Sequence, residues 1–338
     1  MPTARETVLL GGDGVSDPKV LEAACGLPKG KPPHALPKLA APAAAAPDTK
    51  IVETEKPGSV GDVTTPAPSA PPPAASGAPA PAAPTLSPDQ MATNNACIKL
   101  ALLFSTGQGV EVDHERAFSL RSHACGLGSL EACVLVGAAL AFGNGTKADP
   151  VQALAVYSHA CAGKVAEGCL RVGAAYQLGN GTPKNQALAY KAFQDACALG
   201  SPAACFNSAA MEEKGEGTPA NAEHAQLHYG MACSGNFPSA CFNLALIYDL
   251  GKVTTANPGW AAELYQRACD AGHPGGCGGY GALLYQGRGV AEDRTRGHEM
   301  MQEGCAKSSD WACRQLRNLV EKENPAPAAS ASGAPSAP

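Results

Sequence analysis

The stretch Ala124-Cys125-Gly126-Leu127-Gly128-Ser129-Leu130-Glu131-Ala132-Cys133 carries two cysteines eight residues apart, and the same spacing recurs along the chain. The first cysteine belongs to a first set whose members lie 36 residues apart, at Cys125, Cys161, Cys197, Cys233, Cys269 and Cys305. The second belongs to a second set with the same interval, at Cys97, Cys133, Cys169, Cys205, Cys241, Cys277 and Cys313. No insertion or deletion interrupts this register, so the sequence predicts a structural repeat of 36 residues.

Each second-set cysteine begins a pattern that is typical of an amphipathic helix, which we call helix one. The third and seventh residues after the cysteine are usually bulky and the fourth is small, as in Leu100, Phe104 and Ala101. This spacing places the three side chains on one face of a helix. Ser208 and Glu212 depart from the pattern in one repeat. Helix one ends at paired glycines, which suit a left-handed cap and a tight turn.

A second helix, helix two, begins at a position that is always Asp or Asn: Asp113, Asp149, Asn185, Asn221, Asn257 and Asp293. An oxygen at this position caps a helix, and a proline follows it twice, as expected at a first helical residue. Capping explains this Asp/Asn position better than metal binding does, because the position occurs once per repeat and half of the residues found there are neutral. Helix two closes on the first-set cysteine. The sequence therefore predicts an all-α fold, an α-solenoid of stacked antiparallel helix pairs.

The rest of the chain differs in composition, which predicts the domain organisation. Residues 28–90 are a Pro/Ala-rich linker or insertion, and residues 324–338 are an Ala/Pro tail. Such stretches lack the apolar area that offsets ordering entropy, which predicts disorder or polyproline-like structure, either as a spacer or as filler. Residues 91–323 form the solenoid. Residues 1–27 are a short N-terminal segment whose Ala24-Cys25-Gly26-Leu27 is similar to the end of a helix two.

Each first-set cysteine ends helix two, and its partner lies in the first turn of the next helix one. The turn between them is short, so the side chains face each other at the Cα separation of about 5.5 Å that a disulfide requires. We therefore predict the pairs Cys125–Cys133, Cys161–Cys169, Cys197–Cys205, Cys233–Cys241, Cys269–Cys277 and Cys305–Cys313. Cys25 and Cys97 either form a seventh pair, with the Pro-rich stretch inserted in its turn, or remain two free thiols.

Other uses of the cysteines fit less well. Zinc sites favour Cys-x2-4-Cys spacing, and redox catalysis favours Cys-x-x-Cys, which this chain lacks. Buried reduced thiols in a cytosolic protein remain the alternative to structural disulfides.

Composition argues against other classes of protein and bears on the compartment. Lys+Arg number 25 and Asp+Glu 30, a net charge of −5, so no basic surface for nucleic-acid phosphates is expected. No apolar run approaches the roughly 18 residues of a transmembrane helix. No signal peptide is recognised, because Val8-Leu9-Leu10 is followed at once by Gly11-Gly12-Asp13. Disulfides favour a periplasmic or secreted protein, with the cytoplasm or a mitochondrial intermembrane space as alternatives.

The repeat resembles the Sel-one-like repeat family, a branch of the tetratricopeptide-like solenoids. The residues that match its pattern are Ala96, Leu100, Ala101, Phe104, Gly107, Gly109, Val110, Asp113, Ala117, Ala124 and Cys125, and similar matches recur over about residues 97–320. The cysteine spacing is similar to that of the cysteine-rich subgroup, which includes the Helicobacter cysteine-rich proteins, and of a mitochondrial assembly factor. The resemblance implies a right-handed superhelix that binds partners on a concave face. For Helicobacter-type members it also implies penicillin binding or weak β-lactamase activity.

The sequence supports no catalytic site. A serine β-lactamase needs Ser-x-x-Lys with supporting motifs, and the match at Ser16-Asp17-Pro18-Lys19 has none of them and contains a helix-breaking proline. His114 and His298 each precede a glutamate but lack the second histidine of a metal site. We therefore predict no catalytic residue, no metal and no cofactor. A β-lactamase-type hydrolase rests on the resemblance alone.

Binding residues are easier to propose, because helix one lines the concave face of tetratricopeptide-like arrays. The candidates follow the second-set cysteines: Lys99, Arg171, Phe206, Asn207, Phe242 and Asn243. In tetratricopeptide domains, Asn and Lys or Arg at comparable positions grip a peptide backbone or a carboxylate. In the alternative interpretation these asparagines bond only neighbouring turns and the phenylalanines only pack.

Three functional hypotheses follow. The leading one is a monomeric, non-enzymatic scaffold that binds a protein or peptide. The second is a penicillin-binding protein or weak β-lactamase, and the third is a cytosolic regulatory adaptor with reduced cysteines.

Overall fold

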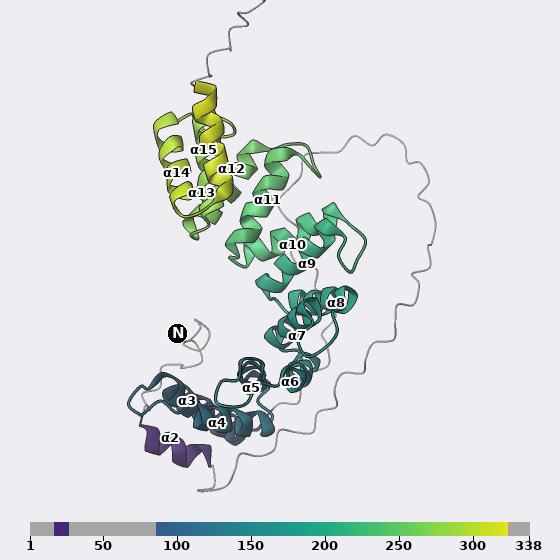
Figure 1. Ribbon diagram of the computed structural model, residues 1–338, viewed down its shortest axis with the longest axis vertical. Coiled ribbons are helices and arrows are strands. Elements are labelled where there is room, and N and C mark those ends of the chain that lie inside the picture. Colours follow the sequence, from purple (N-terminus) through teal and green to yellow (C-terminus); the bar gives the residue numbers. More distant parts are fainter. Residues whose placement is uncertain (1–16, 27–85, 324–338) are drawn as a thin grey trace, which may run out of the picture. The chain divides into compact units, whose positions relative to one another are not determined.

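The computed structural model describes residues 17–26 and 86–323, and this part of the chain contains 14 helices and no strand. The chain divides into two compact units, and the division falls in the sequence between Asn185 and Gln186. Figure 1 labels the helices of both units. None of the helices in the described ranges is both long and apolar enough to cross a membrane. The predicted linker and tail fall almost wholly outside the described residues, so their boundaries stay predictions.

The first unit alternates helix twos with helix ones, and each helix packs against the next one in the chain. The helix twos are α2 (Pro18–Cys25), α4 (His114–Gly126) and α6 (Pro150–Ala162). The helix ones are α3 (Pro88–Thr106), α5 (Leu130–Phe142) and α7 (Ala166–Leu178).

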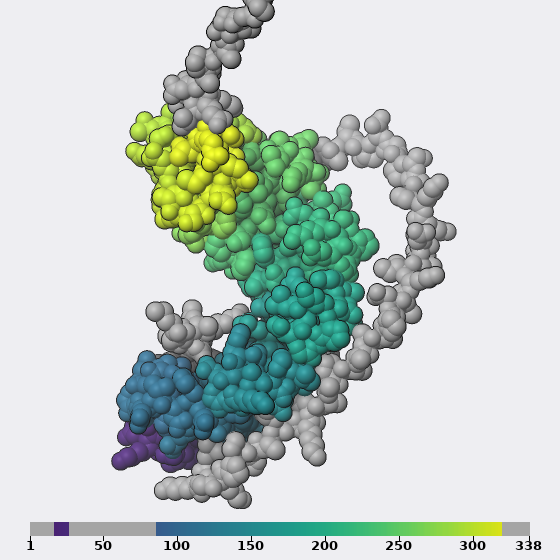
Figure 2. All heavy atoms as spheres, viewed as in Figure 1, coloured from purple at the N-terminus to yellow at the C-terminus, as the bar shows by residue number. Residues whose placement is uncertain are grey.

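The second unit continues the alternation, and helix ones of successive repeats also touch, α11 with α13 and α13 with α15. Its helix twos are α8 (Gln186–Ala198), α10 (Ala222–Ser234), α12 (Pro258–Asp270) and α14 (Arg294–Ala306). Its helix ones are α9 (Pro202–Lys214), α11 (Pro238–Leu250), α13 (Pro274–Gln286) and α15 (Asp310–Glu323). Side chains fill the spaces between the helices of each unit (Figure 2). Repeats that bury their apolar faces against their neighbours make a solenoid, so the predicted α-solenoid is confirmed.

The Asp/Asn column fixes where helix two begins. The side chain of Asp113 accepts a hydrogen bond of 2.8 Å from the backbone N–H of Arg116, and the equivalent cap forms at Asp149, Asn221, Asn257 and Asp293. The backbone N–H of Asp113 also donates to the carbonyl of Phe104 in the preceding helix one, at 2.9 Å. One residue therefore closes the loop and caps the second helix, which confirms the predicted capping role.

The two glycines of each pair have different roles. The first, such as Gly143, has a φ of 73° and is the left-handed C-cap of helix one. The second packs against the start of the preceding helix two: a Cβ on Gly217 would lie 2.2 Å from the carbonyl oxygen of Gln186. Gly145 approaches the backbone of His114 in the same way. The second glycine therefore sets how closely successive repeats approach.

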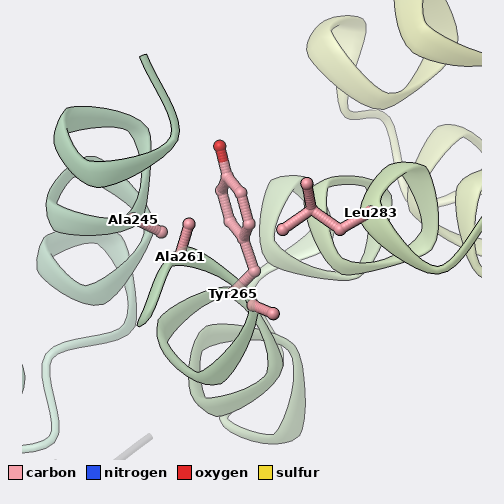
Figure 3. Close-up of a cluster of buried hydrophobic side chains, with 5 residues drawn as sticks. Ala245, Ala261, Tyr265 and Leu283 are labelled. Carbon is pink, nitrogen blue, oxygen red and sulfur yellow. The ribbon is translucent and has the colours of Figure 1, made fainter. Parts of the chain in front are cut away.

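Small residues on helix one make room for bulky residues on helix two. A Cβ on Gly137 would lie 2.6 Å from the ring of Tyr157. In the second unit Tyr265 of α12 is 0% exposed, and its ring stands between Ala245 of α11 and Leu283 of α13 (Figure 3). The core is thus packed by small residues on helix one that face bulky residues on helix two in successive repeats.

All six predicted disulfides form, and Cys25 pairs with Cys97, so the seventh pair is confirmed. The Cα separations lie between 4.5 and 4.8 Å. In the chain-entropy model a bridge across eight residues contributes about 2.5 kcal/mol, and one across 72 contributes about 4.4 kcal/mol. The Cys25–Cys97 bridge and an ion pair between Glu22 and Arg116 hold α2 in the place of a helix two that precedes α3.

We predict that Gly217→Ala lowers the free energy of unfolding by about 3 kcal/mol, because alanine adds a steric clash with Gln186 to its backbone strain. Gly200→Ala is the matched control: its φ of 85° gives similar strain, but no atom lies within 4 Å of the added Cβ, so the loss should be about 1 kcal/mol. Denaturant unfolding under non-reducing conditions measures both. Equal losses would contradict the role assigned to the second glycine.

Candidate functional site

The predicted binding residues follow second-set cysteines in both units. The first unit holds Lys99 on α3 and Arg171 on α7, and the second unit holds Phe206 and Asn207 on α9 and Phe242 and Asn243 on α11. Arg171 is exposed and pairs with Glu167 one turn earlier, with an N–O distance of 2.8 Å. Such a pair contributes only a few tenths of a kcal/mol. The guanidinium therefore remains accessible to a ligand.

The two asparagines have identical sequence neighbours, yet their partners differ. The side chain of Asn243 hydrogen-bonds the hydroxyl of Tyr229 on α10, and that hydroxyl donates to Oε2 of Glu213 at 2.9 Å. Burial, followed by the charge of Glu213, raises the pKa of Tyr229 well above its ordinary value. The phenol therefore stays protonated and links α9, α10 and α11. Asn243 is consequently part of a structural junction.

Asn207 has no such partner. The position equivalent to Tyr229 in the preceding repeat is Phe193, whose ring carries no hydroxyl. Asn207 is half-buried, and its amide makes no hydrogen bond to another described residue. Both donors and the acceptor of the Asn207 amide are therefore unused within the described residues, whereas Asn243 donates one N–H to Tyr229.

The two phenylalanines pack on rings that come from the same repeat and from the following turn. Phe206 lies 5.8 Å from Tyr229 and 5.0 Å from Phe237, measured between ring centroids. Phe242 lies 5.8 Å from Tyr265 in the equivalent arrangement. Both phenylalanines remain partly exposed. They therefore pack and still present an aromatic surface.

Ser208 and Glu212 of α9 lie in the interior of the second unit, 0% and 1% exposed. Glu212 accepts a hydrogen bond of 2.7 Å from the hydroxyl of Tyr190 on α8, and its other oxygen lies 2.8 Å from Nδ1 of His228 on α10. We call Tyr190, Glu212 and His228 the polar core cluster. Its members compensate the buried carboxylate, which would otherwise be strongly destabilising. The Ser208 hydroxyl has no hydrogen-bond partner in the described residues.

Burial, together with the hydrogen bond to Glu212, raises the pKa of Tyr190 to about 12. The phenol therefore stays protonated as a donor to Glu212 at ordinary pH. Gln194 donates a further hydrogen bond of 2.6 Å to the same hydroxyl. The groups of the cluster thus satisfy one another, which is the chemistry of a structural cluster rather than of an activated nucleophile.

In the sequence Glu212 stands out only as a departure from the pattern, and its partner was not predicted. The missing signal was His228, because the equivalent residues of the other repeats are apolar: Leu120, Val156, Ala192, Leu264 and Met300. Two polar replacements on helices that pack together predict a buried pair.

The Ser16–Lys19 match offers no catalytic geometry in the described residues. Lys19 lies in the first turn of α2, and Asp17 caps that helix by accepting a hydrogen bond of 2.8 Å from the Lys19 backbone N–H. Ser16 lies outside the described residues. In the described ranges, no three His, Cys, Asp or Glu side chains are grouped as a metal site would need.

A hollow of about 420 Å³ lies where α2 meets α3 and the loop at Gly109. In the described residues α2 has 8 residues, whereas most helix twos have 13. Arg116 lies beside the hollow, with its guanidinium carbon 4.5 Å from the centre of the Phe104 ring. The hollow thus marks a shortened helix two, and residues 1–16, which precede it, lie outside the described part.

The family model described as Sel1 repeat matches six segments that together cover more than half of the chain. The matched residues are 94–121, 130–162, 166–201, 202–237, 238–273 and 276–309. The segments follow the 36-residue register of the cysteines. A search of curated proteins found no match.

Solved structures share the fold. A protective antigen of uropathogenic Escherichia coli strains with an SLR fold is 21% identical with a TM-score of 0.62, covering 69% of this chain and 51% of that one. This chain therefore spans about half of that protein. A Sel1 repeat protein from Oxalobacter formigenes is 20% identical with a TM-score of 0.59, covering 66% and 91%. Cysteine rich protein B of Helicobacter pylori is 24% identical with a TM-score of 0.30, covering 37% and 90%.

We predict that Glu212→Leu and His228→Leu are each destabilising by about 2–3 kcal/mol, because the first removes the partner of both Tyr190 and His228 and the second leaves the buried Glu212 with Tyr190 alone. The double variant restores residues found in other repeats and should unfold within about 1 kcal/mol of the unmodified protein. Denaturant unfolding with intact disulfides gives the double-mutant cycle. Losses that simply add would show that the two side chains do not compensate each other.

Proposed function

Because the chain belongs to the Sel1 repeat family, we propose that it is a non-enzymatic scaffold that binds a peptide or protein on the concave face of its repeats. The resemblance predicted from the sequence is thereby confirmed. Sel1 repeat folds serve in general as scaffolds for protein interactions. A rigid array of this kind presents a preformed surface, so a ligand binds without first ordering the protein.

One observation supports the proposal most directly. Asn207 and Asn243 occupy the same position of the repeat, but Tyr229 engages only Asn243. The amide of Asn207 is left without a partner in the described residues, beside a partly exposed Phe206. An amide can donate to and accept from a peptide backbone at the same time. We therefore assign Asn207 as the residue that holds the main chain of the ligand.

The other candidates have supporting roles in this proposal. Lys99 and Arg171 place positive charge on the helix ones of the first unit, where acidic side chains or a carboxylate terminus of a ligand would bind. Phe206 and Phe242 supply apolar contact in the second unit. Asn243 contributes indirectly, because it holds Tyr229 in place.

The disulfides support a proposal for the compartment. Seven bridges that close successive repeats indicate an oxidising environment, since the cytosol keeps thiols reduced. We propose that the protein works in the periplasm or is secreted. Its partner is then a protein or peptide of the same compartment.

We predict that Asn207→Ala lowers partner capture about tenfold and leaves the thermal midpoint unchanged. The experiment compares the bound fraction recovered by purified full-length protein and variant from periplasmic and secreted fractions, quantified by mass spectrometry. Asn243→Ala should instead lower the stability by about 1 kcal/mol, because Tyr229 loses a hydrogen bond.

Asn95→Ala is the matched surface control, since Asn95 is an exposed asparagine on α3. It should change neither capture nor stability. Equal capture by the unmodified protein and by Asn207→Ala would contradict the assignment of Asn207.

A further inference from the structure

Partly exposed rings of the second unit form two groups, Phe206 with Phe237 and Phe242 with His273 and Trp311, and we call them together the aromatic strip. Phe237 is the N-cap residue of α11 and Phe242 lies in the first turns of that helix, so the start of one helix carries a ring of each group. Phe242 stacks on His273 with centroids 4.7 Å apart, and Trp311 of α15 meets Phe242 edge-on at 5.7 Å. The buried rings of Tyr229 and Tyr265 support the strip from below.

The rings are specific to these repeats. The position of Phe206 and Phe242 is aliphatic in Ile98, Val134 and Leu170, and the position of Phe237 and His273 is occupied in other repeats by Ser129, Val165, Ser201 and Ser309. Ser129 and Ser201 cap their helices, whereas Phe237 makes no capping hydrogen bond. A lost cap is destabilising by about 1 kcal/mol. Val165 and Phe237 both lack a capping hydrogen bond, but only Phe237 places a ring at this position, and a departure of this kind is expected at a functional surface.

Glycines on α13 allow a close approach of α15, which carries the outer ring. The residue of α13 equivalent to Phe242 is Gly278, whose added Cβ would lie 2.5 Å from the Cβ of Ala312, the neighbour of Trp311. A Cβ on Gly275 would lie 3.0 Å from the ring of Phe242. The glycines of α13 therefore let Phe242, His273 and Trp311 converge at one place.

The groups around the strip indicate what kind of ligand it takes. The indole N–H of Trp311 and the amide of Asn207 make no hydrogen bond within the described residues, so both can donate to carbonyl oxygens. Arg267, fixed by Asn236 at 3.0 Å, lies at the turn before Phe237 and disfavours a cationic ligand. The strip thus fits an uncharged, apolar chain that has free carbonyl groups.

We propose that the aromatic strip binds a proline-rich polypeptide segment in the polyproline II conformation. Such a segment forms no internal hydrogen bonds, so its carbonyls are free, and its rings pack on aromatic side chains. The proposal names the ligand class of the proposed scaffold and rests on that function. The chain itself carries a segment of this chemistry at residues 66–84, which contains Pro71-Pro72-Pro73 and no charged residue.

The test is a titration of the full chain with a synthetic peptide of residues 66–84. Trp260→Phe leaves Trp311 as the sole tryptophan, and its emission reports binding. We expect a saturable emission change, which is absent with an analogue whose prolines are all alanine. The same titration on a chain carrying Pro71→Gly, Pro72→Gly and Pro73→Gly removes competition from the protein's own segment.

Phe237→Ser is the decisive variant, because it removes a ring of the strip and restores the serine cap of other repeats. It should weaken peptide binding at least tenfold without lowering the thermal midpoint. Phe142→Ser, which removes a ring 79% exposed outside the strip, should leave the affinity unchanged.

No saturable change in either chain, or equal affinities of Phe237→Ser and Phe142→Ser, would overturn the proposal. If Asn207→Ala still lowers partner capture in that case, the scaffold function stands and only the ligand class is wrong.

Discussion

The bridge between the end of each helix two and the first turn of the next helix one is the constraint on which the repeats depend. It joins two cysteines eight residues apart with Cα atoms about 4.5 Å from each other. The turn between them therefore has the same length in each of these repeats. With that turn fixed, the caps, the paired glycines and the small and bulky columns recur every 36 residues. The bridge at Cys25–Cys97 obeys the same geometry across 72 residues, and it shows that the bridge, not the length of the turn, secures α2.

Much of the architecture could be predicted from the sequence because the signals repeat. The caps at Asp113 and its equivalents, the glycine loops and the disulfides each occur in most repeats, so a single exception does not hide them. The features that could not be predicted occur once. Only the partner of Glu212, His228 on another helix, explains why this carboxylate is buried.

The candidate site was only partly predictable for a related reason. Asn207 and Asn243 are identical in local sequence, and their difference depends on whether the preceding repeat supplies Tyr229 or Phe193. Likewise the phenylalanines were recognised singly, whereas the aromatic strip depends on Trp311, which lies more than 60 residues along the chain. Contacts between repeats therefore decide which copies of a repeated residue are available for binding.

The two kinds of departure from the repeat suggest how the chain separates stability from recognition. Inside, the polar core cluster keeps the packing of α8, α9 and α10 while replacing apolar residues with a compensated pair. On the surface, Phe237 replaces a stabilising cap with an exposed ring. The repeated skeleton, secured by disulfides, tolerates such changes, so a ligand surface can differ from repeat to repeat without altering the fold.

Mapping the disulfides tests the central claim most directly. Mass spectrometry of the intact protein before and after reduction should show a difference of about 14 Da, because seven bridges each take up two hydrogens. Non-reducing digestion should then recover Cys25 linked to Cys97 and every first-set cysteine linked to the cysteine eight residues later. Free thiols in the purified protein, or pairs that join other cysteines, would contradict the account.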